Sequence, residues 1–157
     1  MLEGYYYNPV TGTRYLFEIT EYGSGDYGGT RINLNDTTNV SVWSIVDTTV
    51  YINGEATYTY DGTILYTNIV EGLVIENDII TGSVKRTTTF PNQETIEWEY
   101  VFYANGSVEH RQGYVLTDYN ETYTIEGNIV KFGGNRTSWT HWYLYNEQLY
   151  EDILLPL

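Results

Sequence analysis

The sequence contains no cysteine, which excludes disulfide bonds, thiol nucleophiles and thiolate metal ligands. Basic residues are scarce too, because seven lysines and arginines stand against 21 acidic residues and give a formal net charge of -14. Binding to duplex nucleic acid needs clustered lysine and arginine, so we expect no direct nucleic-acid binding. Long apolar runs are also missing, and none approaches the roughly 18 to 20 residues of a membrane span.

Motifs that carry catalysis or hold metals are missing as well. The chain has no His-x-His or HExxH spacing, no DxDxDG loop, no GxSxG elbow and no glycine-rich phosphate loop. It has two histidines, His110 and His141, and neither has an acidic partner on its own strand face. We therefore expect a protein that is not an enzyme, with no catalytic residue, no metal and no cofactor.

The residues that are abundant favour β-strands. Tyrosine occurs 18 times and tryptophan four times, and hydrophobic residues make up 41% of the chain, enough to bury a core. Ile96, Trp98, Tyr100 and Phe102 occupy every second position, with Glu97 and Glu99 between the first three, which is the period of a half-buried strand. No stretch of ten or more residues shows the apolar spacing of a helix. The sequence thus predicts a nearly all-β fold.

Turn signals recur at short intervals and indicate a meander of hairpins. They are Asn53-Gly54, Asp61-Gly62, Asn77-Asp78, Asn105-Gly106, Gly127-Asn128 and Asn146-Glu147. We expect ten or more antiparallel strands that close into a barrel, because closure removes free sheet edges. No linker or charge block divides the chain, so residues 1–157 are expected to form a single domain.

One hairpin has a register that separates apolar from polar residues. A two-residue turn at Gly127-Asn128 places one set on each face of the sheet. The predicted pairs are Tyr123 with Phe132 and Ile125 with Val130 on the buried face, and Thr124 with Lys131 on the exposed face. At Asn146-Glu147 the same reasoning pairs Leu144 with Leu149 and Tyr143 with Tyr150.

The Asn105-Gly106 hairpin allows two registers. A two-residue turn places Glu109 and Arg111 beside the aromatic residues of the preceding strand. A three-residue loop with a glycine bulge places Val108 and His110 beside Phe102 and Tyr100 instead. We favour the bulged form.

Glycines cluster between Glu21 and Thr30, at positions 23, 25, 28 and 29. Because they lie between strands rather than before a helix, they indicate a loop. An ordinary hairpin connection is favoured over a lid above a barrel mouth.

Three segments resemble bacterial lipocalin-like domains of the calycin type. They are Leu2-Glu3-Gly4-Tyr5-Tyr6, the hairpin from Thr122 to Phe132, and the strand pair from Trp142 to Tyr150. The chain departs from the family pattern where Tyr6 replaces the usual tryptophan, and no basic partner for it lies near the C-terminus. The resemblance implies a cup-shaped barrel that binds a small apolar or amphipathic ligand.

The leading functional hypothesis is a non-enzymatic barrel with an aromatic-lined cavity for a small hydrophobic or amphipathic ligand. The expected ligand-binding residues are Trp98, Tyr100, Phe102 and His110, with plain core packing as the alternative at this face. At least half of the four tryptophans, at positions 43, 98, 139 and 142, should be core residues.

Two other functions stay open. One is an acidic phage or viral module that engages a basic protein, and the other is a carbohydrate-binding β-sandwich. No signal peptide is recognisable at the N-terminus. The location is open between the cytoplasm and export with a removed signal.

Overall fold

A computed structural model describes the chain except residues 24–25, 90, 93, 113–114, 117–120 and 135–140. The described residues form sixteen strands and no helix, and neighbouring strands pair antiparallel. The prediction of an all-β antiparallel fold with ten or more strands is confirmed. Within these residues there is no helix of the length and hydropathy that a membrane span requires.

The chain divides into two compact units. Unit 1 comprises Met1–Asn68 and Glu151–Leu157, and unit 2 comprises Ile69–Tyr150. The strands, in chain order, are β1 (Gly4–Tyr7), β2 (Arg14–Tyr22), β3 (Tyr27–Asn33), β4 (Val40–Val46), β5 (Thr49–Ile52), β6 (Glu55–Tyr60), β7 (Leu65–Val70), β8 (Leu73–Glu76), β9 (Ile79–Thr89), β10 (Thr95–Phe102), β11 (Ser107–Gln112), β12 (Val115–Leu116), β13 (Glu121–Glu126), β14 (Ile129–Gly134), β15 (His141–Tyr145) and β16 (Gln148–Pro156). The expectation of a single domain over residues 1–157 stays a prediction.

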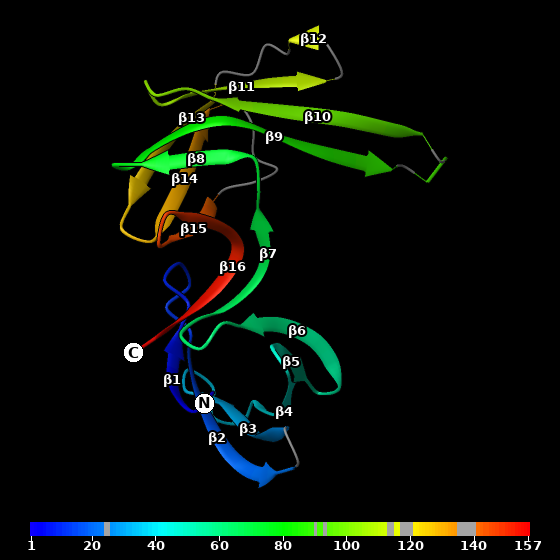
Figure 1. Ribbon diagram of the computed structural model, residues 1–157, viewed down its shortest axis with the longest axis vertical. Helices are drawn as coiled ribbons and strands as arrows, with labels where there is room; N and C mark the ends of the chain where they lie inside the picture. The colour runs from blue at the N-terminus through cyan, green and yellow to red at the C-terminus, as the bar shows by residue number, and fades with distance from the viewer. Residues whose placement is uncertain (24–25, 90, 93, 113–114, 117–120, 135–140) are drawn as a thin grey trace. The chain divides into compact units, whose positions relative to one another are not determined.

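Unit 1 contains a closed barrel. Strands β1 to β7 pair in chain order, β7 pairs with β16, and β16 pairs with β1, so eight strands form a ring (Figure 1). The last pairing places Tyr6 opposite Pro156 and Tyr7 opposite Leu155. The predicted closure into a barrel is thus confirmed, and the ring has no free edge.

Aromatic side chains pack edge to face inside unit 1. The Phe17 ring lies 5.5 Å from that of Tyr6 and 5.7 Å from that of Trp43, and Tyr27 also packs on Trp43 at 5.7 Å. Trp43 is buried, and its indole N–H donates to the Thr30 carbonyl at 3.0 Å. The polar edge of this large side chain is therefore satisfied within the core.

Glycine in β3 permits a close approach of the neighbouring strands. Gly28 and Gly29 lie in the strand, opposite Ser44 and Trp43 of β4, so the expectation of a loop was wrong at these two positions. A Cβ atom on Gly29 would lie 1.7 Å from the Glu18 carbonyl oxygen of β2. Only glycine permits β2 and β3 to approach this closely, next to a bulge between Ile19 and Glu21.

The first residues of the chain pack into unit 1. The Leu2 side chain is fully buried, and its backbone N–H donates to the Tyr27 hydroxyl at 2.7 Å. The Tyr60 hydroxyl lies 3.2 Å from the Met1 carbonyl oxygen. Burial, with a hydrogen bond to Tyr60, raises the pKa of Tyr6 well above its ordinary value, so this tyrosine stays neutral.

Unit 2 is built on one antiparallel sheet in the order β8-β9-β10-β11-β13-β14-β15-β16, with β12 paired to β11. The β13–β14 hairpin has the predicted register, with Tyr123 opposite Phe132 and Thr124 opposite Lys131. Tyr123 is buried and Phe132 partly buried, whereas Thr124 and Lys131 are exposed. The β15–β16 hairpin also pairs as predicted, with Leu144 opposite Leu149.

The β10–β11 hairpin has the favoured bulged loop. Tyr100 lies opposite His110 and Phe102 opposite Val108. The Gly106 N–H donates to the Tyr103 carbonyl at 3.0 Å, and Gly106 has a φ of 91°, which favours glycine. Because of this loop, His110 lies on the same face of the sheet as Tyr100 and Phe102, and its charged neighbours Glu109 and Arg111 lie on the other face.

Two substitutions in the β13–β14 hairpin test its register. Phe132 packs on Trp142 at 5.0 Å and on Phe102 at 6.0 Å, so Phe132→Ala should lower the free energy of unfolding by about 3 kcal/mol. Lys131→Ala removes only an exposed ion pair with Glu126 and should change it by no more than about 0.5 kcal/mol. Urea unfolding of both variants gives the comparison, and equal losses would contradict the register.

Candidate functional site

The structure brings the four predicted ligand-binding residues together in unit 2. Trp98, Tyr100 and Phe102 share one face of β10, and His110 joins them from β11. None of the four belongs to the eight strands of the closed ring. Their role in binding a ligand stays a prediction.

Three of these rings stack nearly parallel. The His110 ring centroid lies 4.9 Å from that of Trp98 and 4.6 Å from that of Tyr100, with interplanar angles of 13° and 9°. His110 is fully buried, Tyr100 is buried, and Trp98 is partly exposed. We call this group the ring stack.

Phe102 lies deeper and has a different role. It packs on Tyr123 at 5.7 Å and Trp142 at 5.8 Å, and only 2% of its surface is exposed. Exposure along β10 therefore rises from Phe102 in the core to Trp98 at the rim. Core packing accounts for Phe102, and Trp98 is the member of the predicted set that solvent reaches most.

Two of the four tryptophans are core residues, as expected. Trp43 in unit 1 and Trp142 in unit 2 are buried. Trp98 is only partly buried, and Trp139 lies outside the described residues.

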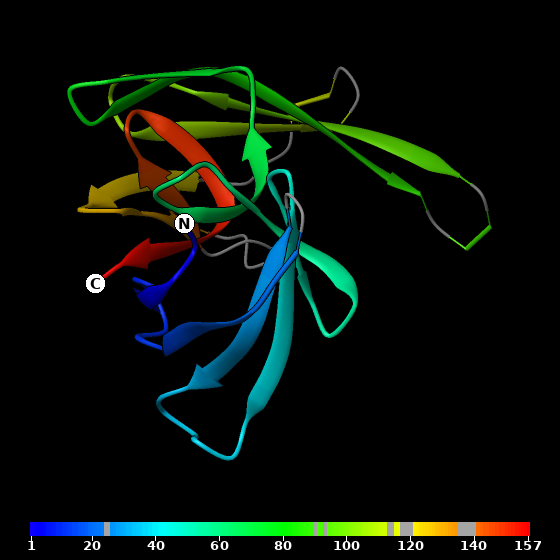
Figure 2. The same cartoon turned by 60° about the horizontal axis from the view of Figure 1, so that its bottom comes forward.

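The strands around the ring stack extend into a ribbon. β9 and β10 pair from Gly82 and Phe102 out to Thr89 and Thr95, whereas β11 pairs with β10 only from Trp98 onward. Figure 2 shows the two strands running on together. Trp98 therefore lies where the three-stranded part of the sheet gives way to the ribbon, and the exposed Gln112 lies opposite it.

A buried acid shares the inner face with His110. Glu121 of β13 is only 5% exposed, and it lies opposite Val108, which is two residues from His110 on the same face. In the sequence, acidic partners were sought only on the same strand as each histidine, and for this reason Glu121 was missed. The register between β11 and β13 is the signal that would have found it.

Charged residues line the outer face of the same strands. Lys85 lies 3.7 Å from Glu97 and 4.0 Å from Glu99, and Arg111 lies 3.6 Å from Glu99 and 2.6 Å from Glu109. These ion pairs place Glu97 and Glu99 on a charged outer face of the sheet. Across the described residues no three His, Asp or Glu side chains gather to hold a metal.

The Glu109 carboxylate has a shifted pKa. Hydrogen bonds from Arg111 and Tyr103 hold this pKa below its usual range, and the bond to Glu109 raises the pKa of Tyr103. Because the folded pKa is depressed, any stabilisation from this group is present above the ordinary pKa and is lost as pH falls through the depressed value.

Removing the guanidinium should reverse part of this shift. In the Arg111→Gln variant, the pKa of Glu109 should rise toward its ordinary value, because the strongest donor is gone. Side-chain carboxyl NMR over a pH titration measures the change. Lys131→Gln is the control and should leave Glu109 unchanged; an unmoved Glu109 in Arg111→Gln would contradict the assigned cause.

Comparison with family models, with curated proteins and with solved structures found no match to this chain.

Proposed function

We propose that this protein binds, without catalysis, a small planar or amphipathic apolar ligand at the Trp98 end of the ring stack. The observation that supports this most is the partly exposed Trp98 ring lying on the fully buried His110. Aromatic rings offer large, rigid surfaces for stacking, and small-molecule sites combine such surfaces with a few polar groups. Gln112, opposite Trp98, supplies an amide for the polar end of an amphipathic molecule.

The two buried rings of the stack, those of His110 and Tyr100, hold the Trp98 ring in place. His110 and Tyr100 stack beneath Trp98, and burial restricts the movement of both rings. A preformed stack lowers the entropy lost when a ligand binds. Phe102 belongs to the core and makes no direct contact with ligand in this proposal.

Charge selects among apolar ligands. The chain carries a net charge of -14, and the described lysines, Lys85 and Lys131, both lie beside carboxylates. The surrounding potential disfavours anionic molecules such as fatty acids. The proposed ligand is therefore neutral or positively charged.

A lipocalin-like relationship stays a prediction. The eight-stranded ring of unit 1 supports it, since barrels of that kind commonly have eight strands. The ligand-binding residues proposed here lie in unit 2 instead, so the proposal does not depend on this relationship.

Calorimetric titration tests the proposal with three probes: a neutral naphthalene derivative, its quaternary-ammonium analogue and a fatty acid. We expect saturable binding of the first two and weaker binding of the third. Trp98→Ala should weaken binding about tenfold, because one stacking face is lost. Tyr22→Ala, which removes an aromatic side chain that is 73% exposed in unit 1, is the matched control and should bind normally.

Two outcomes would count against the proposal. One is equal affinity of the Trp98→Ala and Tyr22→Ala variants for the neutral probe. The other is binding of a basic protein alone, abolished by salt, which would favour the acidic interaction module instead.

A further inference from the structure

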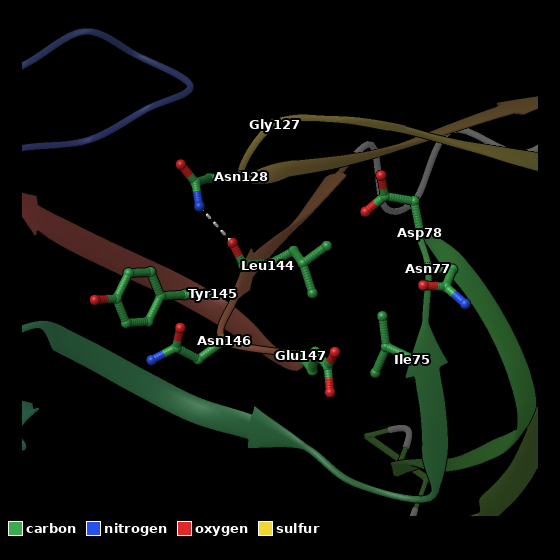
Figure 3. A pocket seen from close by; sticks show the side chains of 9 residues that line it. All are labelled: Ile75, Asn77, Asp78, Gly127, Asn128, Leu144, Tyr145, Asn146 and Glu147. Carbon is green, nitrogen blue, oxygen red and sulfur yellow. Dashed lines mark hydrogen bonds between the residues drawn. The ribbon is translucent and has the colours of Figure 1, made fainter.

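A second candidate site lies at the turns of unit 2. Three hairpin turns surround a hollow of about 270 Å³: Asn77-Asp78 between β8 and β9, Gly127-Asn128 between β13 and β14, and Asn146-Glu147 between β15 and β16 (Figure 3). Each turn can be predicted from the sequence, but the proximity of the three turns in space cannot. Residues more than 60 positions apart thus line one cavity.

The lining combines an apolar floor with hydrogen-bonding groups. Ile75 and Leu144 are the aliphatic members, and Figure 3 shows them beside the Glu147 and Asp78 carboxylates. The other lining residues with polar side chains are Asn77, Asn128, Tyr145 and Asn146, and Figure 3 shows the side chains of Tyr145 and Asn146 directed away from Ile75. No lysine or arginine is among the described lining residues.

One of the turns is tied to its neighbour strand. The Asn128 side-chain amide donates to the Leu144 carbonyl at 2.8 Å, and the Leu144 N–H donates to the Asn128 carbonyl at 2.8 Å. These two bonds fix the β13–β14 turn against β15. The wall of the cavity on this side is therefore preformed.

Asp78 and Glu147, which carry the two carboxylates, both have a backbone conformation that favours glycine. Asp78 has a φ of 62° and Glu147 a φ of 59°, each following an asparagine that also has a positive φ. Asn-Gly is the usual sequence of such hairpin turns, and unit 1 has it at Asn53-Gly54. A residue with a Cβ is less favourable than glycine in this conformation, so glycine would suit the backbone better at both positions.

We propose that this cavity binds an amino sugar. A sugar ring presents C–H groups to an aliphatic floor and hydroxyl groups to amides and carboxylates, and an ammonium group matches the negative charge of Asp78 and Glu147. The hydroxyls donate to the carboxylates and accept from the asparagine amides. A sugar acid would bring a like charge and is excluded from the site.

Titration with three related sugars tests the proposal: glucosamine, glucose and glucuronate. The chemical shifts of the asparagine side-chain amides report binding. Glucosamine should bind most tightly, glucose more weakly and glucuronate not at all. Tighter binding of a glucosamine oligomer assigns the cavity to a polysaccharide, and equal binding assigns it to the free sugar.

Glycine variants separate binding from folding. Asp78→Gly and Glu147→Gly should each weaken glucosamine binding at least about tenfold, while the melting temperature rises or stays unchanged because an unfavourable φ is relieved. Asp47→Gly is the matched control: its φ is 55°, it lies in unit 1, and its binding should be unaffected. Unchanged glucosamine binding in both pocket variants, equal loss in Asp47→Gly, or tightest binding of glucuronate would overturn the proposal.

Discussion

Replacing Gly29 by alanine should lower the free energy of unfolding by at least about 3 kcal/mol. The added Cβ would lie 1.7 Å from the Glu18 carbonyl oxygen and 2.9 Å from the Thr20 nitrogen, and both are backbone atoms of the adjacent strand. Backbone in a closed ring cannot move without disturbing its other pairings, so the clash has no local relief. Urea unfolding of the variant measures the loss.

Gly133→Ala is the matched control for this effect. Gly133 also lies in a strand, but its added Cβ would approach only the Thr122 side-chain hydroxyl, at 3.3 Å. That side chain can rotate, so we expect a change within about 1 kcal/mol. A mild effect at Gly29 similar to that at Gly133 would show that β2 and β3 do not approach each other so closely.

Phe102→Ala should destabilise the protein by roughly 3 to 5 kcal/mol. The ring is almost completely buried and contacts the aromatic residues Tyr123, Phe132 and Trp142 of unit 2. Its removal leaves a cavity that neighbouring strands cannot fill. Thermal unfolding followed by near-ultraviolet circular dichroism measures the loss of this packing.

The neighbouring residue provides the control. Tyr103 is 36% exposed and follows the end of β10, so Tyr103→Ala should change stability by about 0.5 kcal/mol. If Phe102→Ala were as mild as Tyr103→Ala, Phe102 would be a wall of the binding site and not a core residue.

Local signals in the sequence were sufficient to predict the registers of the hairpins. Alternating polarity and a short turn fix a register, because a slip of one residue moves every side chain to the other face. This is why the pairing of Tyr123 with Phe132, and the bulge at Gly106, could be predicted from the sequence alone. The contact between His110 and the aromatic residues of β10 followed directly from that bulge.

Features that depend on distant strands could not be predicted. Gly28 and Gly29 resemble loop residues in the sequence because their roles depend on the close approach of β4 to Gly28 and of β2 to Gly29, which composition does not show. The buried Glu121 comes from a different strand than His110. The cavity in unit 2 requires three turns, from residue 75 to residue 147, to meet, and no local pattern specifies this.

The most direct test of ligand binding at the ring stack is the indole N–H spectrum of the protein during titration with the neutral naphthalene derivative. The Trp98 resonance should shift progressively and saturate, while those of the buried Trp43 and Trp142 stay in place. Saturable shifts confined to Trp43 or Trp142, with Trp98 unmoved, would contradict a binding site at the ring stack.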